Sequence, residues 1–148
     1  MGIKKLEEFM SLGNKQGDAL ALLIDGVENC YKIKRILNND RQLSMIQVLN
    51  ERGRIFKCLF YDENGRSSNL CIYNTSTGKE LKNITYRADG STISSVREFY
   101  SLSGAVKSVT FYKEDGKNIS SSVEYDEAGD EVCFLLYDEK GNVTKNFF

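Results

Sequence analysis

The sequence predicts a mainly β protein, an antiparallel meander of about ten short strands with a short N-terminal helical segment. Two observations predict this fold. Eight of the twelve glycines recur every 12 to 14 residues, at positions 53, 65, 78, 90, 104, 116, 129 and 141. A tyrosine stands four residues before six of them, as in Tyr61 before Gly65 and Tyr137 before Gly141. This period matches one strand plus one tight turn.

The first 27 residues lie outside the glycine repeat and are predicted to be helical. Apolar residues from Ile3 to Leu12 follow helical spacing up to a glycine stop. A second short helix is expected over Ala19–Ile24, with Asp18 as its cap. We expect this lead to cover one face or an open end of the sheet. Residues 1–27 and the meander of residues 28–148 would then form one structural domain.

Each glycine of the repeat is predicted to close a hairpin. Asp or Asn opens most of the turns, as in Asp62-Glu63-Asn64, and such a side chain can bond the backbone two residues on. The glycine supplies the positive φ that closes a bulged hairpin. Between turns lie about eight residues rich in β-branched and aromatic side chains, which is typical of strands. Extrapolated backwards, the repeat places another turn at residues 38–41 and starts the meander near Tyr31.

Strand alternation predicts which faces are buried. On residues 54–61, one side carries Phe56, Cys58 and Phe60, and the other carries Ile55, Leu59 and Tyr61. On residues 117–125 only one side is apolar. We therefore expect burial on both sides near residues 54–61 and 132–136, and on one side between them. Because ten consecutive antiparallel strands rarely stay flat, a curled sheet around the helix or an up-and-down barrel is predicted.

The composition argues against catalysis. The 148 residues include no histidine, so the chain cannot assemble a Ser-His-Asp or Cys-His nucleophile or a histidine-ligated metal. Nearly all carboxylates fall in predicted turns, where water keeps them ionised. The mid-strand exceptions, Glu98 and Glu124, are expected to pair with a cation such as Arg97 or Lys107. We predict that the chain is not an enzyme and takes no cofactor and no metal.

Other features bear on location and partners. The net charge of −1 and the pI of about 5.6 give no electrostatic case for nucleic acid or anionic membrane. The longest apolar run, Ala19–Ile24, is far shorter than the roughly 20 residues of a spanning helix. The N-terminal residues mix lysines with glutamates, unlike a secretory leader. Cys30, Cys58, Cys71 and Cys133 form no C-x-x-C pair, so free thiols in a cytoplasmic protein are expected.

Three turns carry a Tyr-Asp pair, in YDENGR at 61–66, YDEAGD at 125–130 and YDEKGNVT at 137–144. They resemble the YD repeats of Rhs-type bacterial proteins, and less closely the β-hairpin repeats of many small bacterial proteins. As a spacing, the resemblance covers residues 49–148. Full Rhs arrays form large shells around a toxin, and this chain is too short to make one. The resemblance implies a β-meander and hardly bears on function.

Charge is unevenly placed along the chain. Residues 113–141 hold nine carboxylates against three lysines, a net −6, whereas residues 32–66 hold eight cations against four carboxylates, a net +4. An acidic surface of this kind can steer onto a basic partner. The predicted partner-binding residues are the turn carboxylates Glu114, Asp115, Asp126, Glu127, Asp130, Glu131, Asp138 and Glu139. The tyrosines at 61, 86, 112 and 137 are expected to line one end of the sheet, as architecture rather than as a stacking platform.

These observations favour a non-catalytic protein-binding module. The first hypothesis is an intracellular immunity or inhibitor protein that blocks a basic toxin or nuclease through the acidic turns. An alternative is an anti-defence (anti-CRISPR-like) inhibitor of the kind that phages encode. A structural or carbohydrate-binding repeat protein is a further alternative. An exposed edge strand over residues 142–148 could add sheet pairing to a contact. The oligomeric state stays open.

Overall fold

In a computed structural model, residues 17–28 and 30–146 are described. Helix α2 spans Gly17–Ile24, so Asp18 lies inside the helix rather than before it. The helix expected between Ile3 and Leu12 lies outside the described residues. Ten strands follow: β1 Lys32–Leu37, β2 Leu43–Leu49, β3 Ile55–Tyr61, β4 Ser67–Tyr73, β5 Glu80–Tyr86, β6 Ile93–Phe99, β7 Val106–Tyr112, β8 Ile119–Tyr125, β9 Glu131–Tyr137 and β10 Val143–Asn146.

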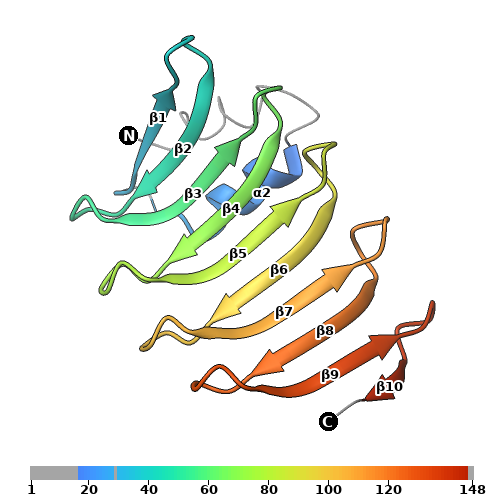
Figure 1. The fold of residues 1–148 in the computed structure, drawn as a ribbon. Helices are drawn as coiled ribbons and strands as arrows, with labels where there is room; N and C mark the ends of the chain where they lie inside the picture. The colour runs from blue at the N-terminus through green and yellow to red at the C-terminus, as the bar shows by residue number, and fades with distance from the viewer. Residues whose placement is uncertain (1–16, 29, 147–148) are drawn as a thin grey trace.

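The strands form one antiparallel sheet in which each pairs with its neighbours in sequence, from β1 through to β10. The predicted mainly β meander is therefore confirmed. The sheet is twisted and open, with β1 and β10 at opposite edges, so the barrel alternative is wrong (Figure 1). No helix among the described residues is long and apolar enough to cross a membrane.

The turn chemistry follows the prediction. In the turn between β3 and β4, Asp62 Oδ1 accepts the N–H groups of Asn64 and Arg66, both at 2.9 Å, and Gly65 has φ 75°. The turn predicted at residues 38–41 is also present, with Arg41 at φ 62° in the place of the glycine. Every glycine of the repeat has positive φ.

A register shift next to each turn changes which face some side chains use. Val48 pairs with Lys57 and Leu49 with Ile55, so Phe56 is an extra residue on β3. At such a bulge, the side chain of the extra residue points to the same face of the sheet as the side chain of the next residue. Phe56 packs against the core cluster and lies edge-on to Tyr31, with ring centroids 5.6 Å apart. Its predicted place beside Cys58 and Phe60 is therefore wrong.

Helix α2 covers one face of the sheet over β3 and β4, as expected of the helical lead (Figure 1). Leu20 and Leu23 of the helix, with Leu59 and Leu70 beneath it, are at most 1% exposed. Lys57 Nζ donates to the carbonyls of Leu22 and Asp25, at 2.7 and 2.6 Å. This cation therefore satisfies carbonyls at the C-terminal end of α2.

Burial is deepest near β3 and declines toward β10. The centre of β3, Lys57 to Leu59, is buried, as predicted. No residue of β9 is buried, and Val132 is 48% exposed. The predicted two-sided burial near residues 132–136 is therefore wrong, because in the described part of the chain α2 contacts β3 and β4 and no helix lies over β9.

A ladder of side-chain bonds ties each turn from that after β2 to that after β7 to the turn two strands along, and we call it the turn ladder. At both ends of the strands, a cation or a tyrosine hydroxyl in one turn donates to a backbone carbonyl 21 to 25 residues further on. Its bonds run from Arg54 to Thr75 and Ser76, Arg66 to Ala88, Lys79 to Leu102, Arg87 to Tyr112, Tyr100 to Tyr125, and Lys113 to Asp138. The ladder holds neighbouring hairpins at a fixed twist, as nearest-neighbour contacts do in repeat proteins.

Candidate functional site

The turns form two edges of the sheet, one at each end of the strands, and the predicted acidic residues are divided between these two edges. Successive turns of a meander alternate between the two ends of the strands, and a strand of seven residues separates the ends by about 20 Å. We define the first acidic edge as Glu114, Asp115, Asp138 and Glu139, in the turns after β7 and β9. The second acidic edge is Asp126, Glu127, Asp130 and Glu131, after β8. The eight carboxylates therefore do not form one continuous rim.

Three of the eight carboxylates hold their own turns. Asp126 Oδ1 accepts the N–H groups of Ala128 and Asp130, at 3.0 and 2.9 Å. Asp115 and Asp138 accept equivalent bonds, and these backbone donors lower the pKa of both carboxyls. These residues have a structural role that their predicted binding role did not include.

The other five carboxylates are available for a partner. Among the described residues, no hydrogen bond or ion pair engages the side chains of Glu114, Glu127, Asp130, Glu131 or Glu139. The turns of the first acidic edge also contain Lys113, Lys117 and Lys140, and Lys113 donates to the carbonyl of Asp138 at 2.9 Å. The second acidic edge, whose turn at residues 126–131 contains no cation, therefore presents uncompensated negative charge to solvent, whereas the charge of the first edge is largely balanced.

A hollow of about 390 Å³ adjoins the second acidic edge, and we call it the β6–β9 hollow. Its floor is a cross-strand row in which Ser108 pairs with Glu98 on one side and Glu124 on the other. Neighbouring strands lie about 4.8 Å apart, so these two carboxylate residues are about 10 Å apart across the small serine. The complete lining is Glu98, Tyr100, Lys107, Ser108, Glu124, Tyr125, Asp126 and Val132.

The register decides the pairing of Glu98. Its carboxylate lies 3.5 Å from Lys82 Nζ on β5, and not against Arg97 or Lys107 as predicted. The reason is that Glu98 and Lys82 are cross-strand partners, whereas Arg97 points to the other face of the sheet. Both members of the pair are at least 40% exposed, so the pair adds little stability.

The hollow combines negative charge with aromatic and aliphatic surface. Tyr100 donates its hydroxyl to the Tyr125 carbonyl at 2.7 Å, which fixes one wall. Val132 offers an exposed aliphatic surface on β9. Carboxylates beside an aromatic ring and an aliphatic surface suit the charged head and the methylene stem of an arginine or lysine side chain. Among the described residues no group of three or more cysteines and carboxylates is placed to hold a metal ion.

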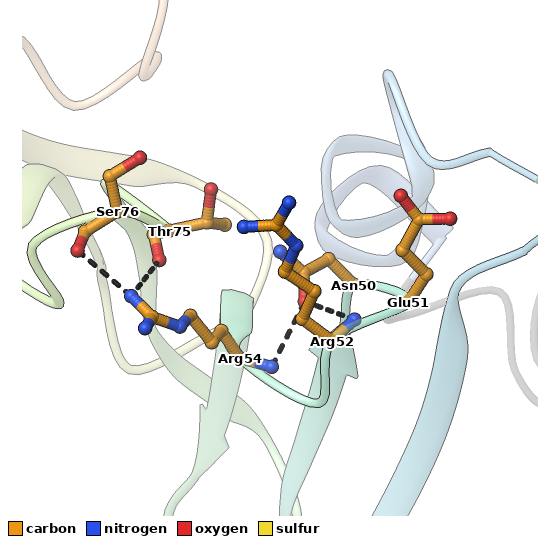
Figure 2. Close-up of a pocket in the computed structure, with 6 residues that line it drawn as sticks. All are labelled: Asn50, Glu51, Arg52, Arg54, Thr75 and Ser76. Atoms are coloured by element: carbon orange, nitrogen blue, oxygen red, sulfur yellow. Dashed lines mark hydrogen bonds between the residues drawn. The ribbon is translucent and has the colours of Figure 1, made fainter.

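The opposite part of the sheet is basic and has a different hollow. Asn50, Glu51, Arg52, Arg54, Thr75 and Ser76 line a polar space of about 430 Å³ between the turns after β2 and β4 (Figure 2). Arg54 Nη1 spans it to the carbonyls of Thr75 and Ser76, at 3.1 and 2.9 Å. This guanidinium is part of the turn ladder, so the space is explained by the architecture.

The predicted tyrosine row lies where it was expected. The strands β3, β5, β7 and β9 all end in a tyrosine at the same end of the sheet: Tyr61, Tyr86, Tyr112 and Tyr137. Tyr86 is 6% exposed, and Tyr61 packs against the core cluster. Half of the row is therefore part of the core.

Above about pH 9 the protein is expected to lose stability. Burial raises the pKa of Cys58 and Tyr61 to about 12 and that of Cys71 to about 11, and it also raises the pKa of Tyr73. The unfolded chain releases these protons first, so the free energy of unfolding falls as the pH rises from about 9. Lys57, whose pKa burial lowers, acts in the opposite direction.

Urea titrations at about pH 7, 9 and 10 would measure this loss. The variant with Cys58→Ala and Cys71→Ala should lose less stability between the last two values than the parent chain. An equal loss in both proteins would show that the thiols do not contribute to it.

Comparison with known proteins gives a partial match to one family model and a likeness in fold. A family model described as "Protein of unknown function (DUF2963)" matches residues 60–108, about a third of the chain. No curated protein matches the sequence. The resemblance to YD repeats stays a prediction.

Structures of TarM share the architecture at low identity. A structure of TarM superposes with a TM-score of 0.52 and 11% identity, over 90% of this chain and 25% of that one. A TarM mutant from S. aureus, in complex with fondaparinux, alpha-GlcNAc-glycerol and UDP, superposes with a TM-score of 0.51 and 12% identity. The match covers 98% of this chain and 24% of that one. A structure of accessory secretory protein 1, 2 and 3 of Streptococcus pneumoniae gives a TM-score of 0.48 and 13% identity. That match covers 78% of this chain and 23% of the other. The chain spans about a quarter of the length of these proteins.

Proposed function

We propose that this chain is a non-catalytic binding module for a basic protein, and that its role is to inhibit or neutralise that protein. A toxin or nuclease with a basic surface fits this chemistry, and an immunity protein is the role we favour. The phage anti-defence role shares the same surface chemistry. A structural or carbohydrate-binding role would not need the acidic edges.

The observation that supports this proposal is the second acidic edge beside the β6–β9 hollow. Glu127, Asp130 and Glu131 have no cationic partner among the described residues. The hollow next to them adds the carboxylate of Glu124, while its Glu98 is paired with Lys82 and its lining also includes Lys107. A basic side chain of the partner would enter the hollow, while the edge attracts the partner's surface charge. Such complementarity mainly raises association rates and selects partners.

Charge reversal on this edge should abolish capture of the partner. The test variant is E127K/E131K, which leaves the turn-holding Asp126 intact. Its matched control is E114K/E139K, which changes the net charge by the same amount on the first acidic edge. Immobilised parent and variants would be exposed to source-organism lysate at about 50 and 300 mM salt, and retained proteins quantified by mass spectrometry.

We expect a basic protein that the parent and the control retain at low salt, and that E127K/E131K retains about tenfold less. Higher salt should weaken its retention, because the screening length falls to about 6 Å at 300 mM salt. Equal retention by all three proteins would refute the second acidic edge as the site. Retention of no protein by the parent would refute the binding role.

A further inference from the structure

Cys58 and Cys71 face each other across β3 and β4. They are direct cross-strand partners in the register, and their side chains are 2% and 4% exposed. Their sequence neighbours Leu59 and Leu70 belong to the cluster under α2. Since successive side chains of a strand point to opposite faces, the two thiols lie together on the face away from the helix.

Two further polar groups adjoin this pair. The side chains of Tyr73 and Glu80 lie close enough to Cys71 to influence the pKa of its thiol, and the amide of Asn83 donates to Glu80 at 3.4 Å. Tyr73 is also close enough to both thiols for their charge to affect its phenol. The pair is therefore a dithiol enclosed by polar side chains, and not two isolated apolar residues.

The geometry of the pair suits a disulfide. Directly opposed residues of antiparallel strands have Cα atoms about 4.5 to 5.5 Å apart, and disulfides bridge about 4.4 to 6.8 Å. The other two cysteines lack this placement: Cys30 is exposed beside Glu28, and Cys133 pairs with Glu124. No disulfide joins any of these four cysteines in the structure.

We propose that Cys58 and Cys71 are a redox modification site that closes reversibly to a cross-strand disulfide, with a low-molecular-weight disulfide such as oxidised glutathione as the oxidant. One cysteine thiolate attacks a glutathione sulfur, forms a mixed disulfide and releases one glutathione thiol. The second cysteine gives up its proton and attacks the protein sulfur of that mixed disulfide. The protein loses two electrons and two protons, and two molecules of reduced glutathione leave.

The disulfide would covalently join β3 and β4, the hairpin against which α2 packs. It closes the segment between β3 and β4, which includes the Asp62–Arg66 turn, and so restricts the unfolded chain. Because the two thiols are buried and burial raises the pKa of both, the reaction is slow in the intact protein and is limited by local opening that exposes the pair.

The test incubates the folded full chain with oxidised glutathione and follows the intact mass. Its Cys30→Ser, Cys133→Ser variant should lose about 2 Da, carry no glutathione, and regain the mass with dithiothreitol. Peptide mapping should join the Cys58 and Cys71 peptides, and the melting temperature should rise by about 5 °C. A parallel incubation in about 1 M urea, below the unfolding midpoint, should give the same product faster.

Single-thiol variants provide the matched control. Adding Cys58→Ser or Cys71→Ser leaves one thiol, which should end as a stable mixed disulfide with glutathione. The proposal is overturned if the two-thiol protein also keeps glutathione on Cys58 or Cys71. It is equally overturned if its mass is unchanged in both incubations, since the urea arm removes limited access as an explanation.

Discussion

Replacing Gly116 with alanine is expected to lower the free energy of unfolding by about 3 kcal/mol. Gly116 has φ 68°, a backbone region that costs an alanine about 1 to 2 kcal/mol. A Cβ at this position would also lie 2.6 Å from Thr92 Cγ2 and 2.9 Å from the Ile93 nitrogen. The backbone atom cannot move away as a flexible side chain can, so the clash adds about 1 to 3 kcal/mol.

Gly141→Ala is the matched control. Gly141 occupies the same place in the next turn on that edge, with φ 84°, but a Cβ there would meet no atom within 4 Å. It should therefore cost only the backbone strain, about 1 kcal/mol. Urea denaturation of both variants separates the two effects. Equal losses would mean that the turns do not press on each other at Gly116.

These glycines show what the repeat predicts and what it cannot. The spacing identified the hairpin turns, because positive φ is a local requirement of each turn. The close approach of Gly116 to Thr92 depends on the twist that brings alternate turns together, and no local pattern records a twist. A signal for the turn ladder was nevertheless present: Arg54 and Lys79 both directly follow a repeat glycine and lie 25 residues apart.

The bulges limited the prediction of faces. Strict alternation assigned Phe56 to the side of Cys58, but an extra residue beside each turn shifts the alternation by one. The core position of Leu59 was unaffected, because it lies beyond the bulge. Alternation is therefore reliable at strand centres and unreliable within two residues of a bulged turn.

The candidate site was predicted in part. Turn carboxylates were recognised from composition, and their division between two edges follows from the meander itself, since consecutive turns lie at opposite ends. The β6–β9 hollow required the register. It depends on Glu98 and Glu124 lying opposite Ser108, and sequence spacing does not fix which residues of neighbouring strands are paired.

Leu59→Ala is expected to cost about 3 to 4 kcal/mol, a large part of the stability of a domain this size. Leu59 is fully buried, pairs across the strands with Ile46 and Leu70, and lies in the cluster with Leu20 and Leu23 of α2. Removing its branched side chain leaves a cavity that neither the sheet nor the helix can fill without moving. Circular dichroism melts and urea titration would measure the loss.

Leu135→Ala tests whether this cost comes from the helix or from the sheet. Leu135 lies on the same face of the sheet as Leu59, in the same cross-strand row. From Leu59 and Leu70 this row continues through Ile84, Val96, Thr110 and Ser122 to Leu135. On β9, however, Leu135 is half-buried, and its cross-strand partners are Ser122 and Asn146. The same substitution should therefore cost only about 1 kcal/mol there. A loss at Leu135 as large as at Leu59 would mean that this face of β9 is covered as tightly as β3 is by α2. It would also leave no bare sheet face beside the β6–β9 hollow for a partner to approach.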